Sequence, residues 1–280
     1  MSAKSSHTHT FDNAFKEFFD ETSTIAWHTQ QLGKAKTTGD SWANVFHRQA
    51  LAELRPPTAA ELSARAIQRA FSRDFQGARR DFLDAIAIED KRSYHEAVAV
   101  LNLNLAWLTD YQRQCQLMID RTSLSGDMME INSSVWTCAL SDQSGIDLDL
   151  WTKNLEVAYI NAKSSNPAPK KEYLAAFENT LGLATYRCQR FETAIEHIQA
   201  SLKLGSYVPA IDHAILAMAY FQLDQPDKAH AAFQQAQSYA AEMQQAEDSG
   251  LVLSNIQRRA KVLELHLLLA EAKLLLDSQN

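Results

Sequence analysis

The chain has 280 residues, 46% of them apolar, and contains only eight Gly and six Pro. This composition is typical of a folded, helix-rich protein and excludes a chain that is disordered over most of its length. The formal net charge of -7 argues against a basic face, so neither nucleic acid nor anionic lipid is an expected ligand.

Residues 1–40 are predicted to form an N-terminal tether that contains one amphipathic helix. A helix over residues 12–21 would place four phenyl rings on one face, because they recur at i, i+4, i+7 and i+8. These rings belong to Phe11, Phe15, Phe18 and Phe19. Burying each ring is worth about 1.5 to 3 kcal/mol, so we expect this docking segment to bind its own chain or a partner. Thr22–Thr24 and Thr37–Asp40 are polar enough to act as the tether.

A first helical hairpin is predicted from Ala59 to Asp90, with Ala78 as the small residue at the helix crossing. Four further helices are expected to fill the next part of the chain, because each shows apolar residues at a spacing of three to four. Their ranges are Tyr94–Leu108, Tyr111–Thr122, Met128–Leu140 and Leu148–Ala162. They make two more hairpins.

Two hairpins that repeat 35 residues apart follow, from Tyr173 to Leu204 and from Ala210 to Met243. In both, small and apolar residues recur at nearly the same offsets. The first has Leu181, Gly182, Ala184, Tyr186, Phe191, Ala194 and Leu202, and the second has Leu216, Ala217, Ala219, Tyr220, Ala229, Phe233 and Ala236. This period is typical of helical repeats, among which the tetratricopeptide repeat has a unit of about 34 residues.

The last predicted helix, Ser254–Leu276, has two neighbouring apolar stripes. One contains Leu263, Leu267, Ala270 and Leu274, and the other contains Val262, Leu265, Leu269, Ala272 and Leu276. A terminal helix that caps a repeat array needs only one apolar face. We therefore expect a capping helix, and the second stripe suggests a homodimer through this helix or contact with the N-terminal helix. The predicted domains are the tether (1–40), the repeats (41–250) and the cap (251–280).

Several segments resemble a known module when taken in order. They are Tyr111–Met118, Val135–Leu140, Asn179–Arg187 and Leu216–Tyr220. Together they are similar to the tetratricopeptide-repeat tails of planctomycete serine/threonine protein kinases and WD40-type proteins, over roughly Leu51 to Met243. The resemblance implies an all-α, right-handed superhelical solenoid of about five hairpins that acts as an interaction segment. Gln189 and Asp224 stand where that family usually has a turn glycine, and the Ser141–Asp147 loop is longer.

The resemblance also implies a binding groove. In this family the second, fifth, ninth and twelfth positions of each first helix point into the concave face. The positions that match are Ala60, Ser63, Ile67 and Ala70, then Ala176, Asn179, Leu183 and Tyr186, then Ile211, Ala214, Met218 and Phe221. The predicted partner-binding residues are Ile67, Asn179, Leu183, Tyr186, Arg187, Met218 and Phe221. A carboxylate clamp is poorly matched, because only Asn179 and Arg187 could serve. The mostly apolar wall favours an amphipathic helix, unless neighbouring helices cover these positions.

No catalytic motif is found. The chain lacks GxGxxG, HRD, DFG, GxxxxGK[ST], HExxH and CxxC patterns, so neither phosphoryl transfer nor metal-assisted hydrolysis has visible machinery. His7 and His9 are attributed to a solvated terminus, and Asp147 and Asp149 to capping of the following helix. No catalytic residue, cofactor or metal is predicted. Cys115, Cys138 and Cys188 are expected to be buried, reduced thiols.

The sequence therefore predicts a non-enzymatic scaffold or adaptor that binds a helical or apolar segment of an unidentified protein partner. The alternative is a regulator or inhibitor subunit that controls a partner enzyme such as a kinase, a protease or a sigma factor. The first residues lack the apolar core of a signal peptide, and charges interrupt the Leu-rich run Leu263–Leu276. A cytoplasmic location is therefore expected.

Overall fold

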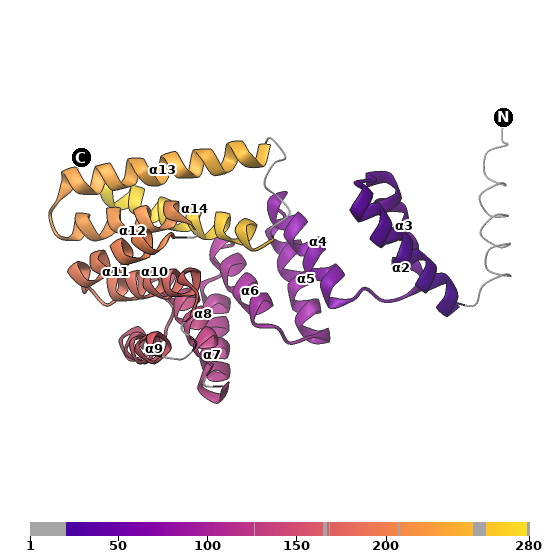
Figure 1. Cartoon of the computed structure of the whole chain (residues 1–280), viewed down its shortest axis with the longest axis horizontal. Coiled ribbons are helices and arrows are strands. Elements are labelled where there is room, and N and C mark those ends of the chain that lie inside the picture. The colour runs from indigo at the N-terminus through magenta and orange to yellow at the C-terminus, as the bar shows by residue number, and fades with distance from the viewer. Residues whose placement is uncertain are drawn as a thin grey trace. The chain divides into compact units, whose positions relative to one another are not determined.

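The computed structural model describes residues 21–125, 127–164, 167, 169–206, 208–248 and 256–278. Within these ranges the regular elements are all helices. The chain divides into two compact units, residues 1–62 and residues 63–280, and Figure 1 shows the helices of both. The predicted docking segment with its four Phe residues lies outside the described residues.

The described part of the first unit contains a helical hairpin made of α2 (Glu21–Thr38) and α3 (Ser41–Leu54). Where a polar tether was expected, residues 21–38 are thus helical. The reason is a buried stripe that spans three turns of α2, which packs against α3; its members are Thr24, His28, Leu32 and Ala35. The Nδ1 atoms of His28 and His47 lie 2.9 Å apart and share a hydrogen bond. Two of the four stripe residues are polar, so the apolar periodicity is weak.

The second unit continues through the predicted hairpins. They are α4 (Ala59–Phe71, which enters this unit at Ser63) with α5 (Phe75–Ile88), α6 (Arg92–Asn104) with α7 (Leu108–Ser125), α8 (Met128–Ala139) with α9 (Leu148–Lys163), α10 (Lys171–Arg187) with α11 (Phe191–Leu204), and α12 (Pro209–Gln222) with α13 (Pro226–Asp248). A final helix, α14 (Ile256–Asp277), follows. Each helix from α5 to α14 packs side by side with the next helix along the chain. The predicted all-α solenoid of about five hairpins is confirmed.

Four of the hairpin turns have the same geometry. In each, the second residue after the end of the first helix adopts the left-handed conformation, with φ between 54° and 59°. These residues are Arg73, Ala106, Gln189 and Asp224. The next backbone N–H then donates to a carbonyl five residues back, at 2.8 to 3.0 Å, which is a Schellman turn. Gln189 and Asp224 therefore occupy the turn-glycine conformation without being glycine, at a cost of about 1 kcal/mol each.

The close crossing of α10 and α11 depends on Gly182. A Cβ at this position would collide with the side chain of Ile198 and approach the carbonyl oxygen of Ala194 to 3.4 Å. Ile198 and Ala194 are both completely buried, so neither can move away without disturbing the core. One hydrophobic core then continues from Val100 of α6 to Ala272 of α14. None of the described helices is long and apolar enough to span a membrane.

We predict that Gly182→Ala lowers the free energy of unfolding by about 1 to 3 kcal/mol, because the added methyl overpacks the crossing. Gly33→Ala is the matched control. Gly33 lies in α2 with open space around its Cα, so alanine should raise stability by up to about 1 kcal/mol through helix propensity. Urea unfolding monitored by circular dichroism measures both. If Gly182→Ala is as stable as wild type, the inferred crossing is wrong.

Candidate functional site

The candidate site is the face formed by the first helices of successive hairpins, which we call the first-helix face. In the structure α14 lies on this face. It packs mainly against α12, also contacts α13 and α6, and is joined by side-chain bonds to α8 and α10. Figure 1 shows α14, in yellow, beside α12 and α13. Because α6, α8, α10 and α12 are all first helices, one helix covers the part of the first-helix face that these four helices form.

The fully buried apolar contacts of α14 come from one stripe with a spacing of three to four, and Leu263 and Leu267 beside it are partly buried against the same core. The buried members of the stripe are Leu265, Leu268, Ala272 and Leu276. The first three belong to the same hydrophobic core as Leu183, Tyr186 and Met218. Leu274, from the other predicted stripe, is 73% exposed, and Ala270 is exposed as well. The helix therefore has one buried face and one open face, as a cap should.

The first polar anchor of α14 is a buried ion pair between Arg187 and Glu271. The Arg187 side chain is 4% exposed. Its Nη1 and Nη2 atoms both donate to Glu271, the second over 2.6 Å to Oε2. Nε donates to the carbonyl oxygen of Ala139 at 2.7 Å, and Nη2 donates to that of Leu140 at 3.2 Å. Burial alone would lower the pKa of Arg187, but the hydrogen bond and charge of Glu271 raise it. The guanidinium thus stays charged and fixed against the end of α8.

The second polar anchor lies two helical turns away. Trp136 Nε1 donates to Glu264 Oε2 at 2.7 Å, and both residues are buried. Lys261 Nζ donates to the same oxygen at 2.6 Å and lies 4.7 Å from the centroid of the Trp136 ring. Glu264 and Glu271 are seven residues apart, so they stand on the same side of α14. Each one satisfies a buried donor of the first-helix face.

The structure changes the view of the predicted partner-binding residues. Leu183 and Met218 are completely buried, and Tyr186 is 6% exposed; burial raises the pKa of Tyr186 to about 12. Arg187 is paired with Glu271. These positions are therefore covered in the fold, which is the alternative that the sequence left open. Ile67 and Phe221 are half-buried.

Three residues of the site were not predicted, namely Trp136, Glu264 and Glu271. The available signal was the pair of acids seven residues apart inside a Leu-rich helix. In the sequence these charges only excluded a membrane span, since nothing local indicates which buried donor each acid meets. Whether the predicted residues bind a partner stays a prediction.

The remaining predicted residue, Asn179, belongs to a buried polar network around Asp212. Asn179 Nδ2 donates to Asp212 Oδ1, and Ser201 Oγ donates to Oδ2 at 3.1 Å. This network links α10, α11 and α12. Burial raises the pKa of Asp212 to about 6, although hydrogen bonds from Ser206, Asn179 and Ser201 act in the opposite direction. Asn179 is therefore engaged inside the fold and not in a carboxylate clamp.

The raised pKa of Asp212 gives a pH prediction. Between about pH 4 and pH 6 the folded state holds a proton that the unfolded state has released, so this group lowers stability as pH rises through that window. Asp212→Asn keeps the shape and removes the charge. We expect it to raise the free energy of unfolding at pH 7 by about 1 to 3 kcal/mol, and by much less at pH 4. Urea unfolding of both proteins at the two pH values measures the difference. An equal gain at both would contradict a raised pKa.

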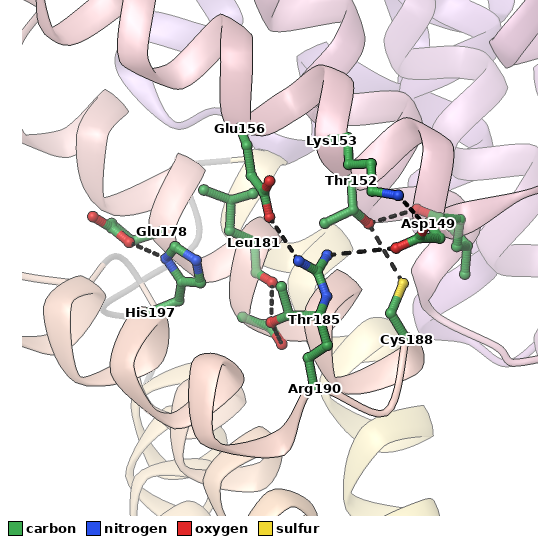
Figure 2. Close-up of polar contacts among 12 residues, drawn as sticks. Asp149, Thr152, Lys153, Glu156, Glu178, Leu181, Thr185, Cys188, Arg190 and His197 are labelled. Carbon is green, nitrogen blue, oxygen red and sulfur yellow. Dashed lines mark hydrogen bonds and ion pairs between the residues drawn. The ribbon is translucent and has the colours of Figure 1, made fainter.

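A second cluster of charged and polar side chains lies between α9, α10 and α11 (Figure 2). Glu178 accepts a hydrogen bond from Tyr159 at 2.5 Å and lies 2.6 Å from His197 Nδ1. Burial alone would raise the pKa of Glu178, but its bonds with His197 and Tyr159 lower it. A carboxylate–histidine pair activates a nucleophile only within hydrogen-bond reach of the ring. In Figure 2, Cys188 points to Thr152 and not to the histidine ring, with its Sγ atom 3.8 Å from Thr152 Oγ1. The Glu178–His197 pair therefore serves to link α10 with α11.

Other residues singled out by the sequence have structural partners. Asp147 caps α9 by accepting from the backbone N–H of Leu150 at 3.0 Å, which confirms its predicted role. Asp149 pairs with Lys153 at 2.6 Å. Cys115 and Cys138 are buried and Cys188 is half-buried; a hydrogen bond with Cys115, together with burial, raises the pKa of Cys138. Across the described ranges, no three His, Cys, Asp or Glu side chains cluster closely enough to hold a metal ion.

Comparison with known proteins gives weak similarities. No family model matches the chain, and no curated protein sequence matches it. Among solved structures, the chain is similar to a thermophilic TPR protein of Thermus thermophilus, with 17% identity over 78% of this chain and 100% of that one, at a TM-score of 0.46. It is also similar to BtubC (BKLC) from P. vanneervenii, with 15% identity over 81% of this chain and 93% of that one, at a TM-score of 0.45. Similarity at this level carries no functional inference, and the resemblance to planctomycete kinase tails is not confirmed.

Proposed function

We propose that the protein is a non-enzymatic adaptor that binds a helical or apolar segment of a protein partner on its first-helix face. The observation that carries this proposal is α14 itself. An amphipathic helix already lies on this face, with Leu265, Leu268 and Ala272 buried. Its contacts have the form of helix-in-groove recognition, in which an apolar stripe gives affinity and a few polar contacts fix the orientation.

The polar contacts support the proposal because they are specific. Arg187 is held by two carbonyl oxygens at the end of α8 and still directs donors outward to a carboxylate. A bidentate guanidinium of this kind recognises a carboxylate in one geometry. Trp136 adds a single N–H donor. A first-helix face with an apolar floor and two fixed donors can select one helix and its direction.

Photo-crosslinking tests the proposal. A benzophenone amino acid is placed at Ile67 or at Phe221, which are half-buried on first helices. Control probes at Leu83 of α5 and Val157 of α9, both exposed on second helices, are the matched comparison. In extracts of the native cell we expect one protein to crosslink from the first-helix positions and not from the controls. Mass spectrometry should map the crosslink to an amphipathic helical segment. Crosslinking only from the second helices would contradict the proposal.

A further inference from the structure

We infer that α14 is an internal competitor for the first-helix face, and that the partner helix it excludes carries an acidic residue and, seven positions before it, a second side-chain acceptor beside a Leu/Ala stripe. This inference rests on the proposed function and adds to it the chemistry of the ligand. The pattern is that of α14, in which Glu264 and Glu271 satisfy Trp136 and Arg187.

Arg187 requires an acid in any helix that covers it. Its side chain is almost completely covered, and a buried charge without a partner is strongly unfavourable. The bonds from Arg187 to Ala139 and Leu140 are made within the repeat array and do not involve α14. The guanidinium therefore stays at the same place when α14 is replaced, and any helix that covers it needs a carboxylate there.

Trp136 accounts for the second requirement, which is a hydrogen-bond acceptor; in α14 this acceptor is an acid whose charge is paired with Lys261. Its indole N–H is buried and must donate to an acceptor, since an unsatisfied buried donor costs about 1 to 3 kcal/mol. In α14 the acceptor is Glu264, seven residues before Glu271. Seven residues are two helical turns, or about 10.5 Å along the axis. A helix is the backbone that presents an acceptor and an acid at this spacing on one side.

The buried stripe sets the remaining positions of the ligand. Counted from the first acid, leucines follow at one, four and twelve residues, and Ala272 lies at eight. Ala272 has no exposed surface, so a larger residue at this position would overpack the contact. A partner helix should therefore have a small residue directly after the acid that meets Arg187.

Competition follows from the connection of α14 to the same chain. α13 ends at Asp248 and α14 begins at Ile256. Such a short connection gives a tethered helix an effective concentration in the millimolar range. A partner helix with the same contacts therefore replaces α14 only in one of two cases. Either the partner binds more tightly than α14, or the Arg187–Glu271 pair is weakened.

The test uses the full-length chain with Glu271→Arg, which places two positive charges together and weakens the internal helix. The probe is a fluorescein-labelled peptide of residues 256–278, measured by fluorescence anisotropy. Wild-type protein should bind it weakly. Glu271→Arg protein should bind it about tenfold more tightly or better, because the peptide supplies the acid that the variant lacks. A peptide that itself carries Glu271→Arg should not bind.

The matched control is Asp277→Arg, which makes the same charge change at an exposed position near the end of α14. It should behave like wild type, both in the protein and in the peptide. If Glu271→Arg shows no cooperative thermal unfolding, Glu271→Gln, which deletes only the charge, replaces it with the same peptides and expectations.

Two results would overturn the inference. If no folded variant at position 271 binds the peptide, α14 is a permanent cap. If both peptides bind equally well, the acid is not recognised. Either result removes Arg187 as the contact that recognises an acid of the partner. Whether the first-helix face binds a partner at all is decided separately by crosslinking from Ile67 and Phe221.

Discussion

The guanidinium of Arg187 joins three parts of the chain that are distant in sequence: the end of α8, the end of α10 and the middle of α14. Its partner Glu271 is 84 residues away. A buried charge cannot remain unpaired, so the positions of these three helices depend on one another. The Arg187 bonds to Ala139 and Leu140 also satisfy carbonyl groups that a helix end leaves open. One side chain thereby caps the end of α8 and holds α14 against the end of α10.

This arrangement answers a general problem of helical repeats. Each hairpin packs only on its neighbours, so the array leaves an apolar face at its end and along its first helices. An uncovered apolar face that extends over several helices would favour association with other protein molecules. Here α14 covers it with one stripe and presents Lys273, Leu274 and Asp277 to the outside. The Leu274 side chain is an isolated exposed apolar group, which is ordinary on a protein surface.

Polar groups inside the array have a related role. Asp212, Glu178 and Arg187 are each bonded to residues of other helices. Small residues at the crossings, such as Gly182 and Ala194, allow the helices to approach closely but do not by themselves fix one register. Hydrogen bonds between definite partners do fix the register of two packed helices. The Asp212 network shows that this has a cost, because burial disfavours the charged carboxylate.

The sequence by itself determined the hairpins from α4 to α13 and the existence of α14, because a helix repeats its apolar residues every three to four positions and its bonds are local. It did not determine α2, whose buried stripe includes Thr24 and His28. Nor did it show that α14 shares one buried core with Leu183, Tyr186 and Met218, or that Glu264 meets Trp136, 128 residues away. Such pairs form only when distant helices pack. Tertiary structure therefore decided that the first-helix face is already occupied.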